Sequence, residues 1–143
     1  MEGSTRLTIL ADTGALYALA DRNDVWHERV TAWWTGARDD VAVPISVLPE
    51  ITHLLGVRRG ADAEAAFVRE AVAGVYTLEP LENEDLSRSA DLIDTYADLP
   101  LGFVDASIVA MAERLGVTSI LTTDRRHFGV IRPAHCERLR LLP

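Results

Sequence analysis

Four acidic residues occupy positions where an acid is not expected. Asp12 and Asp124 each follow an apolar run of the kind that forms a buried strand. Glu50 and Asp105 each interrupt the apolar stripe of a helical segment. A buried carboxylate is costly unless it is paired, and carboxylates gathered in one place raise one another's pKa. Because a divalent metal ion relieves both penalties, the four acids predict a metal-dependent enzyme.

The donor set favours a hard cation. Carboxylate oxygens suit Mg²⁺, with Mn²⁺ as a substitute. Such ions activate water and stabilise the in-line displacement of a phosphodiester. The four histidines, His127 among them, show no metal-ligand spacing with one another. Metal-activated water also makes a histidine general base unnecessary, so we expect carboxylates alone to form the site.

The residues around the last acid offer supporting groups. Thr122 or Thr123 could orient a water or a carboxylate beside Asp124, although a β-branched strand residue explains each equally well. Arg125 and Arg126 follow directly, and arginine is suited to bidentate phosphate contacts. A solvated loop is the alternative interpretation of these two arginines.

Each acid also has a purely structural interpretation. Asp12 and Asp124 could cap the segments that follow them, and Asp105 could be a first-turn acid stabilised by the helix dipole. Glu50 is harder to explain in this way, because an inward-facing glutamate is uncommon unless it is paired. An arginine at the end of its own helix, at position 58 or 59, could be that partner.

Strands and helices are predicted to alternate along the chain. The expected strands cover residues 7–11, 41–43, 75–78 and 119–123, with a last extended segment at 138–142. The expected helices cover residues 13–20, 24–37, 46–59, 62–72, 83–98 and 103–115, and residues 125–127 form a short connection. Asn23 or Asp24 is expected to cap the second of these helices, Ser46 the third and Asp62 the fourth. The strands read as continuous apolar runs, which is typical of parallel strands covered on both faces. We therefore expect an α/β fold.

These elements can bring the four acids together. In open parallel α/β sheets, ligands bind at the carboxyl ends of the strands, and Asp12 and Asp124 occupy that edge. Glu50 and Asp105 each share a helical face with apolar residues three and four positions away. Both should therefore face inward from the starts of their helices, and one pocket above the sheet can hold all four.

Length and composition are those of one globular domain spanning residues 1–143. Hydrophobic residues make up 48% and charged residues 25% of the 143 residues. No apolar run is long enough for a membrane span, and the first six residues show no signal peptide. Cys136 is the only cysteine, which excludes an internal disulfide, so a cytoplasmic location is expected.

The net charge of −8 limits the possible partners without excluding nucleic acid. The four proposed site acids carry half of it, so any basic surface must be local. All 14 basic residues are arginines. Chemistry that needs a lysine is therefore excluded.

Three tryptophans gather in the second helical segment. Trp26, Trp33 and Trp34 lie within nine residues of one another, which is a large apolar area for one helix of a small domain. We predict that part of this face contacts a partner subunit or another protein.

Four segments resemble the acidic motifs of PIN-domain nucleases, in the same order along the chain. They are residues 12–16 (Asp-Thr-Gly-Ala-Leu), 44–50 (Pro-Ile-Ser-Val-Leu-Pro-Glu), 102–108 (Gly-Phe-Val-Asp-Ala-Ser-Ile) and 122–128 (Thr-Thr-Asp-Arg-Arg-His-Phe). The compact size is most similar to VapC-type toxins of bacterial toxin–antitoxin pairs.

The resemblance implies a three-layer α/β/α fold with a mostly parallel sheet and a Mg²⁺-dependent endoribonuclease that cuts structured RNA, such as tRNA or ribosomal RNA. It also implies a homodimer and a cognate antitoxin whose tail covers the active site. Asp12 and Asp105 correspond to direct metal ligands, and Glu50 and Asp124 to acids that act through water or on a second ion.

Two other functions remain open at this point. A metal-dependent phosphatase of the haloacid-dehalogenase kind needs an acid two residues after its nucleophilic aspartate, where this chain has Gly14. A non-catalytic binding module would use the four acids only as caps.

Overall fold

The computed structural model describes residues 7–143, and the first six residues, with the expected absence of a signal peptide, lie outside that range. The strands are β1 (Thr8–Ala11), β2 (Asp40–Pro44), β3 (Thr77–Glu79), β4 (Ser119–Leu121) and β5 (Arg140–Leu142). The helices are α1 (Thr13–Ala20), α2 (His27–Gly36), α3 (Leu48–Arg59), α4 (Ala61–Val72), α5 (Asn83–Thr95), α6 (Phe103–Leu115) and α7 (Arg125–Val130). Within residues 7–143, no helix combines the length and apolar character that crossing a bilayer requires.

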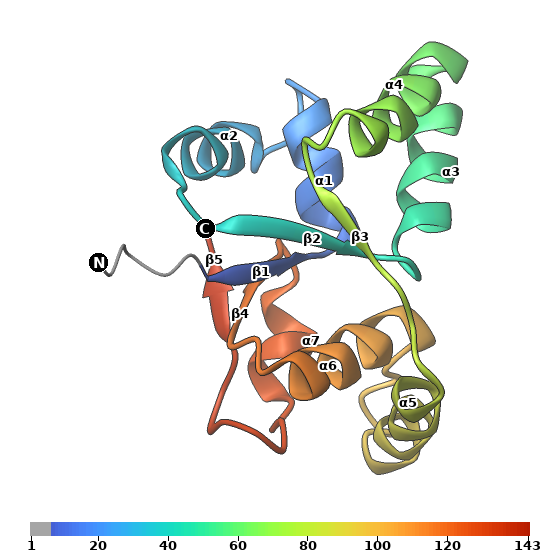
Figure 1. Cartoon of the computed structure of the whole chain (residues 1–143), viewed down its shortest axis with the longest axis vertical. Helices are drawn as coiled ribbons and strands as arrows, with labels where there is room; N and C mark the ends of the chain where they lie inside the picture. The colour runs from blue at the N-terminus through green and yellow to red at the C-terminus, as the bar shows by residue number, and fades with distance from the viewer. Residues whose placement is uncertain (1–6) are drawn as a thin grey trace.

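The five described strands form one sheet in the order β3-β2-β1-β4-β5, and every neighbouring pair is parallel. Helices α1 to α4 cover one face of this sheet and α5 to α7 the other (Figure 1). The expected three-layer α/β/α fold is therefore confirmed, with a sheet that is parallel throughout.

The central strands are buried on both faces. Ile9 and Leu10 in β1, and Ile120 and Leu121 in β4, are at most 2% exposed. Burying such a side chain contributes about 1.5–3 kcal/mol. The continuous apolar sequences of β1 and β4 therefore correctly predicted strands that are covered on both faces.

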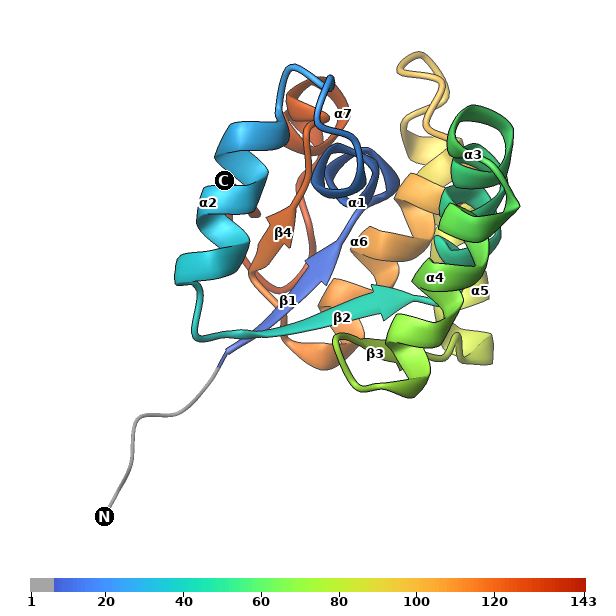
Figure 2. The same cartoon turned by 90° about the horizontal axis from the view of Figure 1, so that it is seen from above.

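The strand order reverses between β1 and β4, and the space beyond the carboxyl ends of these two strands is called the crevice here. The chain leaves β1 toward β2 on one side and leaves β4 toward β5 on the other. Such a switch point opens a space outside the carboxyl ends of the two strands. The backbone N–H of Asp12 donates to the carbonyl of Leu121 at 2.9 Å, so the two strand ends lie side by side at this crevice (Figure 2).

Helix α2 begins later than expected. Asp24 accepts a hydrogen bond from the backbone N–H of Trp26 at 2.8 Å. Asp21 likewise accepts from the backbone N–H of Asn23 at 2.9 Å. These local side-chain bonds form turns that compete with helical bonding, so the helix starts only at His27.

Two further predicted caps are wrong. The hydroxyl of Ser46 does not cap α3 but hydrogen-bonds to the hydroxyl of Ser107 at 2.6 Å, which joins the approach to α3 with α6. Asp62 does not cap α4, because Gly60, with a φ of 97°, ends α3 and leads the chain straight into α4.

Residues 125–127, expected as a connection, instead begin helix α7. Asp124 accepts hydrogen bonds from the backbone N–H groups of Arg126 at 3.1 Å and His127 at 3.0 Å, which is N-capping. Phe128 is 1% exposed and anchors the helix. The interpretation of Asp124 as an N-cap is therefore confirmed, and this capping role is compatible with a further role in the site.

Helices α5 and α6 are joined by a buried ion pair. Asp85 is 1% exposed, and both of its carboxylate oxygens lie 3.0 Å from Nε of Arg114. Asp85 also accepts from the backbone N–H of Glu82 at 2.9 Å in a capping box. This carboxylate therefore holds together the start of α5 and the end of α6, the helix that carries Asp105.

Asp85→Ala should lower the free energy of unfolding by about 3–5 kcal/mol, because it leaves the Arg114 guanidinium without its buried partner. Urea denaturation measures this loss. The matched control is Asp94→Ala, an exposed aspartate on the same helix, which should stay within about 0.5 kcal/mol of wild type. Equal losses in the two variants would contradict this account of the ion pair.

Candidate active site

Asp12 lies at the end of β1 and caps α1. It is 6% exposed, with one carboxylate oxygen accepting from the backbone N–H of Thr13 at 2.8 Å and the other from the hydroxyl of Thr122 at 3.0 Å. Burial raises the pKa of Asp12 to about 6, against the effect of these hydrogen bonds, and the negative charges of Asp124 and Glu50 add to the rise.

Asp105 enters the same crevice from the first turn of α6. It is half-buried, and burial is the main cause that raises its pKa to about 7. The charges of Asp12 and Asp124 raise it further, whereas His127 lowers it. The expectation that α6 turns this acid toward the two strand ends agrees with these interactions.

Glu50 is more exposed than its sequence pattern predicts. It lies in the first turn of α3 at the rim of the crevice, where the hydroxyl of Thr13 donates to its carboxylate. Arg59, one of the two arginines expected to pair with Glu50, instead lies 3.7 Å from the carboxylate of Asp21. Val57, on the same helical face as Glu50, is 70% exposed, and the residues of α3 that face the core are instead Ile51 and Leu55.

Thr122 links the two strand-end acids. It is fully buried, and its hydroxyl donates to Asp12 and accepts from the backbone N–H of Asp124 at 2.9 Å. Thr123 instead packs against Gly14, where an added Cβ would lie 2.5 Å from the threonine hydroxyl. Of the two threonines, only Thr122 thus has the contacts that orient a carboxylate.

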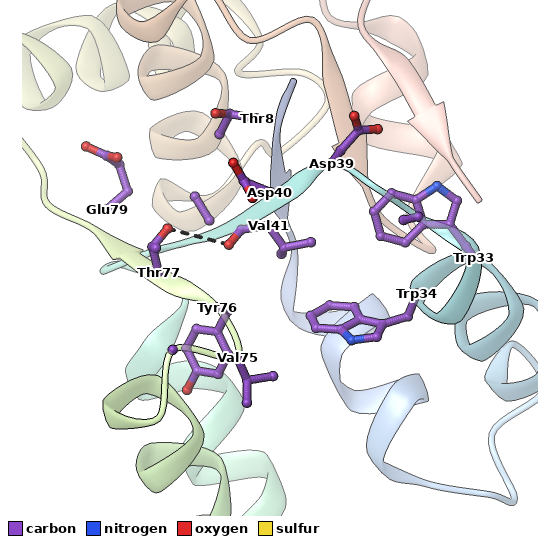
Figure 3. A pocket seen from close by; sticks show the side chains of 13 residues that line it. Thr8, Trp33, Trp34, Asp39, Asp40, Val41, Val75, Tyr76, Thr77 and Glu79 are labelled. Carbon is purple, nitrogen blue, oxygen red and sulfur yellow. Dashed lines mark hydrogen bonds between the residues drawn. The ribbon is translucent and has the colours of Figure 1, made fainter. Parts of the chain in front are cut away.

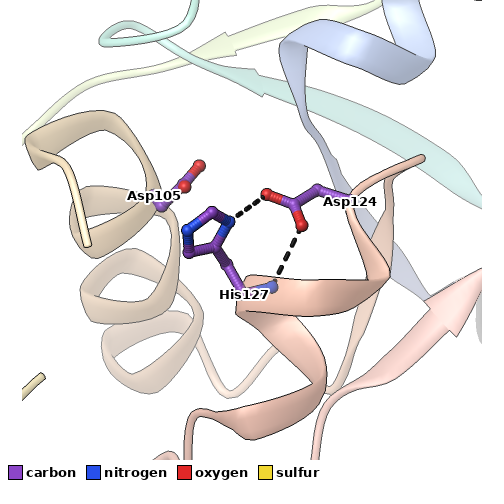
Figure 4. A group of neighbouring side chains, drawn as sticks. All are labelled: Asp105, Asp124 and His127. Carbon is purple, nitrogen blue, oxygen red and sulfur yellow. Dashed lines mark hydrogen bonds and ion pairs between the residues drawn. The ribbon is translucent and has the colours of Figure 1, made fainter. Parts of the chain in front are cut away.

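His127 was missed by the sequence analysis. One donor atom from each of Asp105, Asp124 and His127 lies within 4.8 Å of the others, and the three side chains converge from α6 and α7 (Figure 4). His127 follows Asp124 by three residues, a spacing that places both on one side of a helix. That signal is visible only when residues 125–130 are recognised as helical.

The two arginines after Asp124 lie at the surface. Arg125 donates to the carbonyl of Pro143 at 2.7 Å, and its guanidinium lies 5.4 Å from the ring centre of Trp26. Arg126 is exposed. Their contact with RNA stays a prediction.

A separate hollow of about 470 Å³ lies along the start of β2 and the approach to β3 (Figure 3). Trp33 and Trp34 of α2 form one wall and Val75 and Tyr76 the other. Trp33 and Trp34 are only partly buried. Because the hollow lies along the start of β2, it is distinct from the acidic crevice at the carboxyl ends of β1 and β4.

Comparison with known proteins identifies the family. Residues 9–132 match the PIN domain, whose nucleases are metal-dependent, in keeping with the cluster of possible metal donors described above. Ribonuclease VapC26 of Mycobacterium tuberculosis is 33% identical over 135 residues, which cover 94% of this chain and 100% of that protein.

Solved structures agree in fold. The Sarcin-Ricin loop cleaving toxin VapC20 of M. tuberculosis superposes with a TM-score of 0.77 at 22% identity, covering 82% of this chain and 91% of that one. A toxin–antitoxin complex from Klebsiella pneumoniae gives 0.65 at 18% identity, covering 86% and 92%. From its family match and its ribonuclease relative, the chain belongs to the PIN-domain family and is a VapC-type ribonuclease toxin of toxin–antitoxin systems.

Proposed function

We propose that this chain is a single nuclease domain, residues 1–143, that hydrolyses phosphodiester bonds in a structured RNA with Mg²⁺, or with Mn²⁺ as a substitute. The observation that carries the proposal is the convergence of Asp12 and Asp105 on one crevice, where both have a raised pKa. The named target of the VapC20 toxin, the Sarcin-Ricin loop, supports a loop of a structured RNA, such as ribosomal RNA or tRNA, as the substrate here.

The crevice fits a divalent cation. Its carboxylates are desolvated and repel one another, and a bound cation offsets both effects. Asp12 and Asp105 would be direct ligands, with Glu50 and Asp124 acting through water or on a second ion. Bound there, the ion would activate a water molecule and stabilise the charge of the phosphodiester.

The chain's own side chains prepare this site. Thr122 holds Asp12 in place through its hydroxyl, and Thr13 holds Glu50 through its own. Arg125 and Arg126 follow Asp124 directly and are exposed, and their guanidinium groups suit RNA phosphates. These fixed contacts reduce the reorganisation that binding requires.

A cognate antitoxin is the proposed partner, and its tail would cover the acidic crevice. The similarity to a toxin–antitoxin complex supports it. We further propose that the antitoxin occupies the hollow at Trp33 and Trp34. The carboxylates of Asp39 and Glu79 line this hollow, so they favour a segment with apolar and arginine side chains. We also propose that the protein forms a homodimer and acts in the cytoplasm.

Asp12→Asn and Asp105→Asn should each lower RNA cleavage by about 10²–10³-fold or more, because each removes a charge that would hold the ion. Incubation of tRNA and ribosomes with the purified protein and Mg²⁺ or Mn²⁺, followed by mapping of RNA ends, measures the activity. Asp94→Asn is the control and should cleave as wild type does. An Asp12→Asn variant that cleaves at the wild-type rate would refute the proposed site.

Thr122→Val should reduce cleavage by about 10-fold or more, because the carboxylate of Asp12 loses the donor that orients it. Unfolding free energy should fall by about 1–3 kcal/mol, since the backbone N–H of Asp124 loses its acceptor. Thr122→Ser should restore most of both quantities, and Thr123→Val should change little. If Thr122→Val and Thr123→Val behave alike, the linking hydroxyl has no such role.

Without metal, Asp105→Asn should stabilise the protein increasingly as pH rises. The folded pKa of Asp105, about 7, exceeds its ordinary value of 3.8. Between pH 3.8 and about 7, the folded state therefore binds more protons at Asp105 than the unfolded state does. The contribution of Asp105 to the free energy of unfolding is fully present below pH 3.8 and is lost as pH rises through about 7. The variant's advantage should grow from near zero at about pH 3 to about 4 kcal/mol at pH 8, because a tenfold change in proton affinity corresponds to about 1.4 kcal/mol.

Urea unfolding in EDTA at several pH values measures this difference, with Asp94→Asn as the control for a neutralised but exposed carboxylate. A difference between Asp105→Asn and wild type that does not change with pH would contradict the raised pKa.

A further inference from the structure

The imidazole ring of His127 lies between two of the site's acids (Figure 4). Nδ1 is 2.7 Å from a carboxylate oxygen of Asp124. The second ring nitrogen, Nε2, lies on the side of Asp105 (Figure 4). The ring therefore connects Asp124, at the end of β4, with the acid that α6 contributes.

The hydrogen bond assigns the proton on the ring. The tautomer that forms this bond with a carboxylate acceptor has its hydrogen on Nδ1, which donates to Asp124. In the neutral imidazole, Nε2 then has a free lone pair. Within residues 7–143, Nε2 forms no hydrogen bond. It is thus a nitrogen donor directed toward the acidic crevice.

Asp124 is held in place as the orienting partner. Its other carboxylate oxygen accepts the backbone N–H groups of Arg126 and His127, at 3.1 and 3.0 Å. Helix α7 thereby fixes the carboxylate and the ring in one rigid unit. A carboxylate that accepts from one ring nitrogen while the other nitrogen binds metal is a recurring arrangement in metalloproteins.

We propose that His127 is a nitrogen ligand of the divalent ion, together with Asp105, and that Asp124 acts on the ion through this ring. The inference rests on the proposed metal-dependent function and changes the role of Asp124 within it. It also gives the site a preference among ions. Imidazole suits transition metals better than Mg²⁺. The ratio of Mn²⁺ affinity to Mg²⁺ affinity should therefore be larger than at a site made of carboxylates alone.

Pulsed electron paramagnetic resonance of bound Mn²⁺ tests the nitrogen directly. The full-length protein loaded with Mn²⁺ should show modulation from a coordinated ¹⁴N nucleus. His127→Ala should abolish it, whereas His53→Ala, which removes an exposed histidine from α3, should retain it. Labelling wild type with ¹⁵N-histidine should replace the ¹⁴N signal by a ¹⁵N signal, and this test needs no folded variant.

Calorimetric titration with Mn²⁺ and with Mg²⁺ gives the second readout. His127→Ala should weaken Mn²⁺ binding by about 10-fold and Mg²⁺ binding by less. Mn²⁺ that binds wild type without histidine nitrogen modulation would overturn this proposal and leave the proposed nuclease function standing. Wild type that binds neither ion would overturn the metal-dependent function itself.

Discussion

The candidate site depends on the parallel pairing of β1 with β4. Leu10 pairs with Ile120 and Ala11 with Leu121, so the first residues after both strands meet at one edge of the sheet. In this register the Thr122 hydroxyl reaches Asp12. A slip of one residue would turn every side chain of β4 to the opposite face and break that contact. The switch point between these strands then provides the crevice into which α6 delivers a further acid.

The gathering of carboxylates at the ends of β1 and β4 lowers the stability of the fold. The raised pKa values of Asp12 and Asp105 show that the fold holds carboxylates where burial and mutual repulsion disfavour their charge. The apolar strands and the helices on both faces of the sheet supply the stabilisation that keeps them there. A cation bound beside these carboxylates would offset their repulsion, in keeping with the metal dependence of PIN-domain nucleases.

Much of the fold was predictable because its signals are local. Helices α1 and α6 match their predicted bounds, and the apolar strands predicted a covered parallel sheet. The errors arose where a side chain bonds to a distant or competing partner. Ser46 binds Ser107, which is 61 residues away, and Asp24 forms a turn instead of a helix cap. His127 was overlooked because its relation to Asp124 needs a helix, and Gly129 favours a turn there.

The convergence of the four acids was predictable for a different reason. Strand ends and helix starts are the places from which side chains reach a switch point, so the topology of the sheet was enough to gather them. The exposure of Glu50 was not predictable, since tertiary packing buries Ile51 and Leu55 of α3 and leaves the face with Glu50 and Val57 largely exposed. Which acid bonds to which neighbour depends on tertiary contacts that no local pattern contains.

Binding of a divalent ion in the crevice at the ends of β1 and β4 can be tested by anomalous diffraction from crystals of the protein grown with saturating Mn²⁺. We expect an anomalous peak within coordination distance of the carboxylates of Asp12 and Asp105. A map with no peak in this crevice, or with peaks only elsewhere on the molecule, would refute the proposed metal site.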